Sequence, residues 1–180
     1  MAGFVQQGTR LWRHRWAEAR LHSVLPEALS EQLARQVADS ERRHTGQVRI
    51  CVEAGLPAAY VWRNATARER AVALFGKLGV WDTEDNNGVL IYLLLADRAI
   101  EIVADRALVR QVPPGTWDTV VARMGQALRA GDFTQALTQA LDEVTALLTA
   151  HFPPGAQGVD PHGNELTDAP VLSGSLLLKR

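Results

Sequence analysis

The chain has 180 residues and a net charge of −1, and 47% of its residues are hydrophobic. This length suits one domain with its own core, and the near-neutral charge excludes an electrostatic footprint for nucleic acid. The single cysteine, Cys51, excludes an intramolecular disulfide, and the lack of a signal peptide or long apolar span predicts a cytoplasmic protein.

Residues 1–24 predict a basic amphipathic helix, centred on residues 10–22. Trp12 and Trp16 lie four residues apart and share one helix face, while arginines dominate the rest of the segment. Two interpretations remain open. The tryptophans cover the core of the domain itself, or the helix docks on a protein partner or an anionic membrane surface.

Residues 25–152 alternate helical and extended patterns and predict the folded domain. Period-two alternation indicates a strand with one apolar face, whereas the apolar run after Gly88 indicates a strand buried on both faces. In chain order, the predicted elements are a helix from Pro26 to about His44, a strand at Val48–Glu53, a helix opened by the capping box Thr66–Glu69, strands at Val89–Leu95 and Ala99–Ala104, and helices at about Trp117–Ala130 and Phe133–His151.

The order of these elements predicts the topology. Strands 48–53 and 89–95 flank a helix, so they form a parallel βαβ unit. The tight turn at Asp97 makes the third strand antiparallel to the second. We therefore expect an α/β fold with a mixed sheet of about four strands and helices on both faces, an α/β/α sandwich.

Residues 153–180 change in composition to Gly, Pro, Asp and Asn and show no helical period. This segment predicts a flexible C-terminal tail unless the apolar stretch that begins at Val171 pairs with a sheet edge or a partner.

Residues 82–88 are rich in carboxylate and amide side chains and lead directly into the apolar strand. Such oxygen donors are the ligands of hard cations such as Ca²⁺ and Mg²⁺. The alternative interpretation is a solvated polar turn, because Asn, Asp and Gly are ordinary turn formers. The loop does not match the EF-hand pattern, and neither a P-loop nor a nucleophile-elbow motif occurs in the chain.

The topology brings further residues to this loop, because the end of the third strand lies beside the start of the second. Carboxylates gathered in this way repel one another unless a cation joins them. The predicted metal-binding residues are Asp82, Glu84, Asp85, Asn86, Asn87 and Asp105, with His44 and Arg106 as neighbours in the pocket.

Several short strings, in this order, resemble the TPM domain family, named after thylakoid-lumen phosphatase-like and photosystem II repair proteins and a nematode receptor modulator. The strings are His44-Thr-Gly-Gln-Val-Arg-Ile50, Asp85-Asn-Asn-Gly-Val-Leu-Ile91, Ala96-Asp-Arg98, Glu101-Ile-Val103 and Gly131-Asp-Phe133. The resemblance covers roughly residues 25–152 and points to the soluble bacterial branch of the family.

The resemblance implies an α/β/α domain with a divalent-cation site beside the Asn-Gly loop, and a proposed acid phosphatase activity. Where many relatives carry a Gly-Tyr-Gly-Leu-Glu-like string after the third strand, this chain reads Ala104-Asp-Arg-Ala-Leu108, which adds a carboxylate at Asp105. Two functions follow as hypotheses. The domain is a Ca²⁺- or Mg²⁺-binding interaction or scaffold module with an unknown protein partner, or it is a metal-assisted phosphatase acting on phosphomonoesters.

Overall fold

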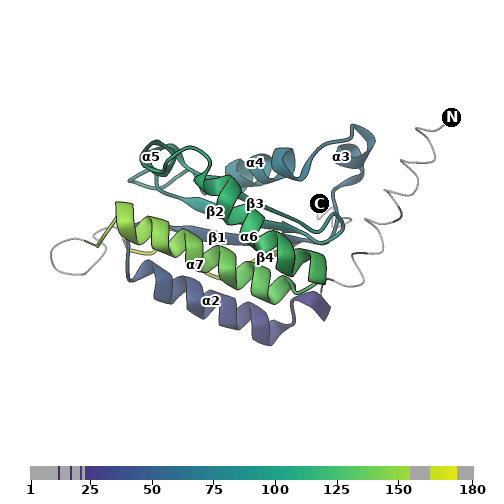
Figure 1. Cartoon of the computed structure of the whole chain (residues 1–180), viewed down its shortest axis with the longest axis horizontal. Coiled ribbons are helices and arrows are strands. Elements are labelled where there is room, and N and C mark those ends of the chain that lie inside the picture. The colour runs from purple at the N-terminus through teal and green to yellow at the C-terminus, as the bar shows by residue number, and fades with distance from the viewer. Residues whose placement is uncertain (1–11, 13–16, 18–20, 22, 155–162, 174–180) are drawn as a thin grey trace.

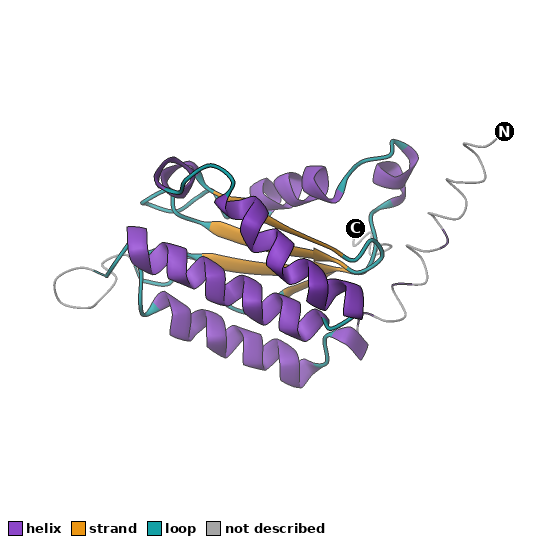
Figure 2. Ribbon diagram, viewed as in Figure 1, coloured by secondary structure: helices purple, strands orange, loops and turns teal. Residues whose placement is uncertain are grey.

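The computed structural model describes residues 12, 17, 21, 23–154 and 163–173. Its sheet has four strands in the order β3-β2-β1-β4, with helix layers on both faces (Figures 1 and 2). The strands are β1 (Val48–Glu53), β2 (Val89–Leu94), β3 (Ala99–Ala104) and β4 (Val171–Ser173). The predicted α/β class with a mixed sheet is therefore confirmed.

The pairing of the three long strands also agrees with the prediction. β1 pairs with β2 in parallel, with Val48 opposite Val89, and β2 pairs antiparallel with β3, with Val89 opposite Ala104. β2 is buried along its whole length, as its uninterrupted apolar sequence predicts. This register places the loop before β2 and the residue after β3 at one end of the sheet.

The protein has two apolar cores, one on each face of the sheet, because successive side chains of a strand point to opposite faces. Val48, Ile50 and Val52 of β1 belong to the larger core, which packs against α2 (Glu27–Glu41), α6 (Thr116–Ala130) and α7 (Phe133–His151). These three helices lie side by side across one face of the sheet in Figure 1. Cys51 belongs to the smaller core under α3 (Ala58–Trp62) and α4 (Ala67–Lys77) on the opposite face.

The helix boundaries follow local capping signals where these are strong. The Thr66 hydroxyl accepts from the Glu69 N–H, and the Glu69 carboxylate accepts from the Thr66 N–H, which completes the predicted capping box of α4. Asp132 caps α7 by accepting from the Gln135 N–H. By contrast, α2 ends at Glu41, before the predicted end near His44.

Two short helices were absent from the sequence prediction: α3 and α5 (Arg106–Gln111). α5 has six residues, too few to display a helical apolar period. Asp105 caps it by accepting from the Arg106 N–H, so a residue expected only as a candidate ligand also begins a helix.

The tail takes the second of the two forms left open by the sequence. Val171–Ser173 pair in parallel with Cys51–Glu53 and add β4 to the free side of β1. The Gln47 side chain holds the preceding residues, because its Oε1 accepts from the N–H groups of Glu165 and Leu166, both at 3.0 Å. Residues 163–173 are thus part of the folded domain.

Most of the predicted basic helix at residues 10–22 lies outside the described residues, which include Trp12 but not Trp16. Trp12 is exposed, while Ala17 and Leu21 are buried against the larger core. In the described part of the chain, no helix combines the length and the apolar character needed to cross a membrane.

Candidate functional site

The polar loop of residues 82–88 is positioned by close backbone packing at the start of β2. A Cβ atom on Gly88 would lie 2.0 Å from the carbonyl oxygen of Val80, so only glycine fits there. Asn86 adopts the left-handed conformation with φ 51°, which asparagine tolerates better than most residues. The shape of the turn therefore requires Gly88 and favours asparagine at position 86.

The Thr45 hydroxyl joins two predicted ligands. It donates to Asp85 Oδ2 at 3.4 Å and accepts from Asn87 Nδ2 at 3.3 Å. A hydroxyl has one proton and a carboxylate can only accept, so the Asn87 amide nitrogen must face Thr45. The Asn87 Oδ1 oxygen therefore faces away from Thr45. Both hydrogen bonds are long, so they constrain the two side chains only weakly.

Asp105 is joined to the same loop through the backbone. Its N–H donates to the Gly88 carbonyl at 2.9 Å, which continues the β2–β3 ladder by one residue. One carboxylate oxygen, Oδ1, accepts from the Arg106 N–H at 2.6 Å. The Arg106 guanidinium in turn donates twice to Asn86 Oδ1, at 2.9 and 2.7 Å. Asn86, Asp105 and Arg106 thus form one connected group.

Two side-chain oxygens at this end of the sheet are buried and have no hydrogen-bond donor. They are Asn87 Oδ1 and Asp105 Oδ2. Asn87 is 0% exposed and Asp105 is 8% exposed. A buried polar atom without a partner costs free energy, and a buried carboxylate oxygen costs more than a neutral one. Such atoms call for a donor or a cation that the described residues do not supply.

The other predicted site residues are not drawn into this group. Asp82 and Glu84 are exposed. Glu84 makes its contacts through the backbone: its N–H donates to Glu165 Oε2 at 3.1 Å, and its carbonyl accepts from Asn86 Nδ2 at 3.4 Å. His44 is fully buried, within hydrogen-bonding distance of Ser40 Oγ at 2.8 Å and of the Gly46 carbonyl at 2.9 Å. His44 therefore has the contacts of a core histidine.

Three residues of the site were missed as members by the sequence prediction: Thr45, Thr83 and Glu165. Thr83 Oγ1 accepts from the Asn87 N–H at 3.2 Å. The strand register was a usable signal for Thr45, because pairing Val48 with Val89 brings residues 45–47 beside residues 86–88. No sequence signal marks Glu165, which reaches the loop only because the tail docks beside β1.

The donor set has a definite chemical character. Among the described residues, no three His, Cys, Asp or Glu side chains cluster closely enough to enclose a metal ion. The available oxygens are instead mixed: carboxylates from Asp85 and Asp105 and an amide from Asn87. Mg²⁺ is commonly held by one or two carboxylates with water in the remaining positions, and Ca²⁺ accepts amide oxygens readily.

A second polar cluster lies at the opposite end of the sheet, where β1 ends. Arg70 of α4 donates from Nε and Nη2 to the two oxygens of Glu53, at 2.9 and 2.7 Å. The Tyr92 hydroxyl donates to Glu53 Oε2 at 2.7 Å. Side-chain exposure is 1% for Glu53 and 13% for Arg70, so this is a buried, bidentate ion pair.

The ionisation of this second cluster is fixed by its surroundings. Burial and the Glu53 carboxylate raise the pKa of Tyr92 well above its usual range. Burial acts to lower the pKa of Arg70, but the hydrogen bonds and charge of Glu53 outweigh it and raise the pKa. Burial and the charge of Glu53 also raise the pKa of Cys51 to about 12, so the thiol is neutral at ordinary pH.

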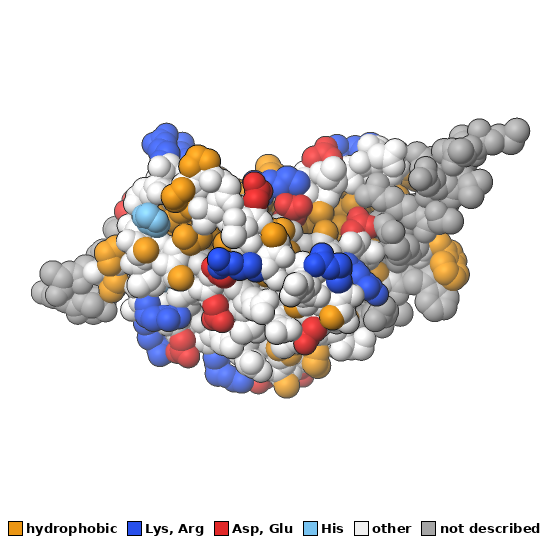
Figure 3. Space-filling view, viewed as in Figure 1, with side chains coloured by type: hydrophobic (Ala, Val, Ile, Leu, Met, Phe, Trp, Pro, Cys, Tyr) orange, Lys and Arg blue, Asp and Glu red, His pale blue; other side chains and the backbone are white. Residues whose placement is uncertain are grey.

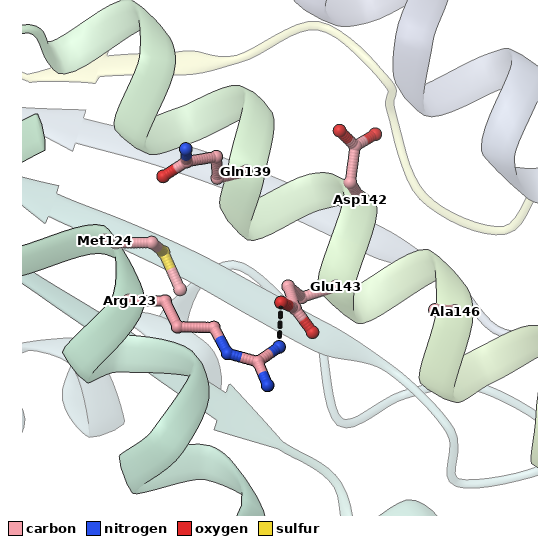
Figure 4. A pocket seen from close by; sticks show the side chains of 6 residues that line it. All are labelled: Arg123, Met124, Gln139, Asp142, Glu143 and Ala146. Carbon is pink, nitrogen blue, oxygen red and sulfur yellow. Dashed lines mark hydrogen bonds and ion pairs between the residues drawn. The ribbon is translucent and has the colours of Figure 1, made fainter.

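A hollow of about 350 Å³ lies between α6 and α7. An ion pair between Arg123 and Glu143 spans it, while Asp142 points away from this pair (Figure 4). A surface pair of this kind is typical of a solvated groove between helices, so it does not compete with the loop as a candidate site.

Comparisons with known proteins agree with this architecture. The NMR structure of the BA42 protein from the psychrophilic bacterium Bizionia argentinensis superimposes with a TM-score of 0.68 and 22% sequence identity, covering 81% of this chain and 93% of that chain. The likeness shows a shared α/β fold. No curated protein sequence matches.

The family model of the TPM domain matches residues 20–147. The chain therefore belongs to the TPM domain family. The match ends before the tail residues that bind Gln47 and form β4.

Proposed function

We propose that the protein is a divalent-cation-binding interaction module whose cation is held at the loop before β2. Asp85, Asn87 and Asp105 supply the ligand oxygens, and water completes the coordination. The observation that carries the proposal is the pair of buried oxygens without donors, Asn87 Oδ1 and Asp105 Oδ2. A cation would satisfy both oxygens at once and would remove the repulsion between the two carboxylates.

The residues around these oxygens suit this role. Thr45 accepts from the Asn87 amide nitrogen, which leaves the Asn87 oxygen available, and Arg106 holds Asn86 without engaging the free Asp105 oxygen. The contacts of Thr45 are long, so Asp85 can turn toward a bound ion at little cost.

Thermal unfolding with and without Ca²⁺, Mg²⁺ or Mn²⁺ tests the proposal. At about ten times the Kd, a cation that binds only the folded state adds about 1.4 kcal/mol of stability, which raises the Tm of a domain of this size by about 3–6 °C. We expect this rise in the wild type and its loss in Asp85→Asn combined with Asp105→Asn.

Asp82→Asn combined with Glu84→Gln is the matched control, because both residues lie in the same loop, both are exposed and the pair loses the same two charges. It should keep the rise. A wild type whose Tm does not change with any of the three cations would overturn the proposal, and equal losses in all variants would indicate unspecific screening.

The phosphatase alternative depends on the same site, with Arg106 next to the cation to stabilise phosphoryl charge. Turnover of p-nitrophenyl phosphate should then require the divalent cation and should fall in Asp85→Ala. Cation binding without such turnover would favour the interaction module, and metal-independent turnover that survives Asp85→Ala would exclude an enzyme at this site.

A further inference from the structure

β3 is an edge strand of the sheet, and the described part of the chain places no strand beyond it. The Asp105 N–H donates to Gly88, so the backbone groups of Glu101 and Val103 face β2 and those of Ile100, Ile102 and Ala104 face outward. On the other side of the sheet, β4 from the tail covers the outer side of β1. Among the described residues, a strand of the tail thus covers β1, whereas no strand pairs with the outer side of β3.

A groove of about 490 Å³ runs along this outer edge, a volume within the range of ligand-binding clefts. Arg68 of α4 lies on one side of it and the first turns of α6 on the other, with α5 nearby. The lining residues are Arg68, Glu101, Ile102, Ala104, Val109, Gly115, Trp117, Asp118 and Val121. In Figure 3, acidic, basic and hydrophobic side chains lie together over the region where Figure 1 places β3 between α4 and α6.

Of the charged side chains that line the groove, Arg68 and Glu101 lie near each other, whereas Asp118 stands apart from them. Arg68 donates to the outward-facing Ile102 carbonyl and lies 3.9 Å from the Glu101 carboxylate. Asp118 is exposed, and no ion pair joins it to any described residue. Beside it, Trp117 offers a half-buried aromatic surface. A carboxylate next to an indole suits a lysine or arginine side chain, by charge and by cation–π contact.

We propose that this groove binds an extended segment of a partner protein, which adds to β3 as a further strand and carries a basic side chain. The outward backbone groups of Ile102 and Ala104 provide the main-chain hydrogen bonds of such strand addition. The basic side chain pairs with Asp118 over Trp117, and apolar side chains of the segment contact Val109, which is 50% exposed, and Val121.

Arg68 covers the edge in the absence of the partner. Its side chain is 53% exposed, so it can move from the Ile102 carbonyl to Glu101 when a strand arrives. Charged cover of this kind protects edge strands from unspecific pairing. A second copy of this chain suits the groove less well, because α4 and α6 flank β3 and keep two sheet edges apart.

Binding of a synthetic peptide tests the proposal, with acetyl-Thr-Val-Lys-Val-Thr-Val-amide as the probe and EDTA present to separate this site from the cation loop. We expect saturable binding below about 1 mM, with the largest amide shifts in the NMR spectrum at Ile102 and Ala104. Asp118→Lys should weaken binding about tenfold and should favour the peptide with Glu in place of Lys.

Asp142→Lys on α7 makes the same charge change at an exposed position away from the groove and should leave binding unchanged. Three outcomes would overturn the proposal: no binding at about 1 mM, amide shifts centred on another surface, or concentration-dependent dimerisation through β3 that excludes the peptide.

Discussion

The two ends of the sheet differ in whether their buried polar side chains have hydrogen-bond partners. Where β1 ends, both oxygens of Glu53 accept hydrogen bonds from Arg70, and one also accepts from Tyr92. Where β2 begins, the Asn87 and Asp105 side chains each keep a buried oxygen without a donor. We call these the closed end and the open end. Polar groups of the closed end are satisfied within the fold, whereas the open end keeps two oxygens for which the described residues supply no donor.

The largest expected effect is at the closed end. Arg70→Ala leaves the Glu53 carboxylate buried and without its cation, which should lower the free energy of unfolding by about 3–5 kcal/mol. Urea denaturation followed by circular dichroism measures this change. Arg63→Ala is the control, because Arg63 pairs with Glu69 at the surface and should cost about 1 kcal/mol or less. Equal losses of stability in the two variants would mean that the buried Glu53–Arg70 pair contributes no more to stability than the surface pair.

Gln47 attaches the tail to the open end of the sheet. Its side chain is buried and bonds to Gly163, Glu165 and Leu166. Gln47→Ala should cost about 2–3 kcal/mol, at about 1 kcal/mol for each hydrogen bond lost, and should speed proteolysis within residues 163–173. Asn164→Ala, an exposed position in the same segment, serves as control. Unchanged proteolysis in Gln47→Ala would show that β4 alone holds the tail.

At the open end, the loss of a charge should raise the free energy of unfolding, whereas at the closed end it should lower it. Asp105→Asn keeps an oxygen to cap α5 but removes the uncompensated buried charge. In EDTA we expect its free energy of unfolding to rise by about 1 kcal/mol or less, measured by urea denaturation. A loss of stability in EDTA would place Asp105 among structural residues and would remove the contrast with Glu53.

The sequence predicted what local patterns encode. The alternation of Val48–Glu53 and the caps at Thr66 and Asp132 fixed strands and helix starts, and connectivity alone placed Asp105 beside the acidic loop. The Glu53–Arg70 pair joins residues 17 positions apart through tertiary packing, and no period or motif marks it. The same is true of Glu165, because its contact with Glu84 spans 81 positions. Such contacts arise from tertiary packing, so they can be identified only once the fold is known.

A further expected effect concerns the reactivity of Cys51, which lies in the core beside the closed end. Burial and the Glu53 charge raise its pKa from 9.0 to about 12, and the reactive species is the thiolate. Iodoacetamide at pH 8 should therefore modify native protein only as fast as it unfolds, and should modify urea-unfolded protein rapidly.

The same shift sets a dependence on pH. A thiol whose pKa is higher in the folded state stabilises the fold below the unfolded pKa, and this stability is lost as the pH rises through the folded pKa. Between pH 9.0 and about 12, stability should fall more steeply in the wild type than in Cys51→Ala, by at most about 1.4 kcal/mol per pH unit. Rapid modification of the native thiol at pH 8 would show that the closed end admits solvent, and the contrast between the two ends would then fail on its closed side.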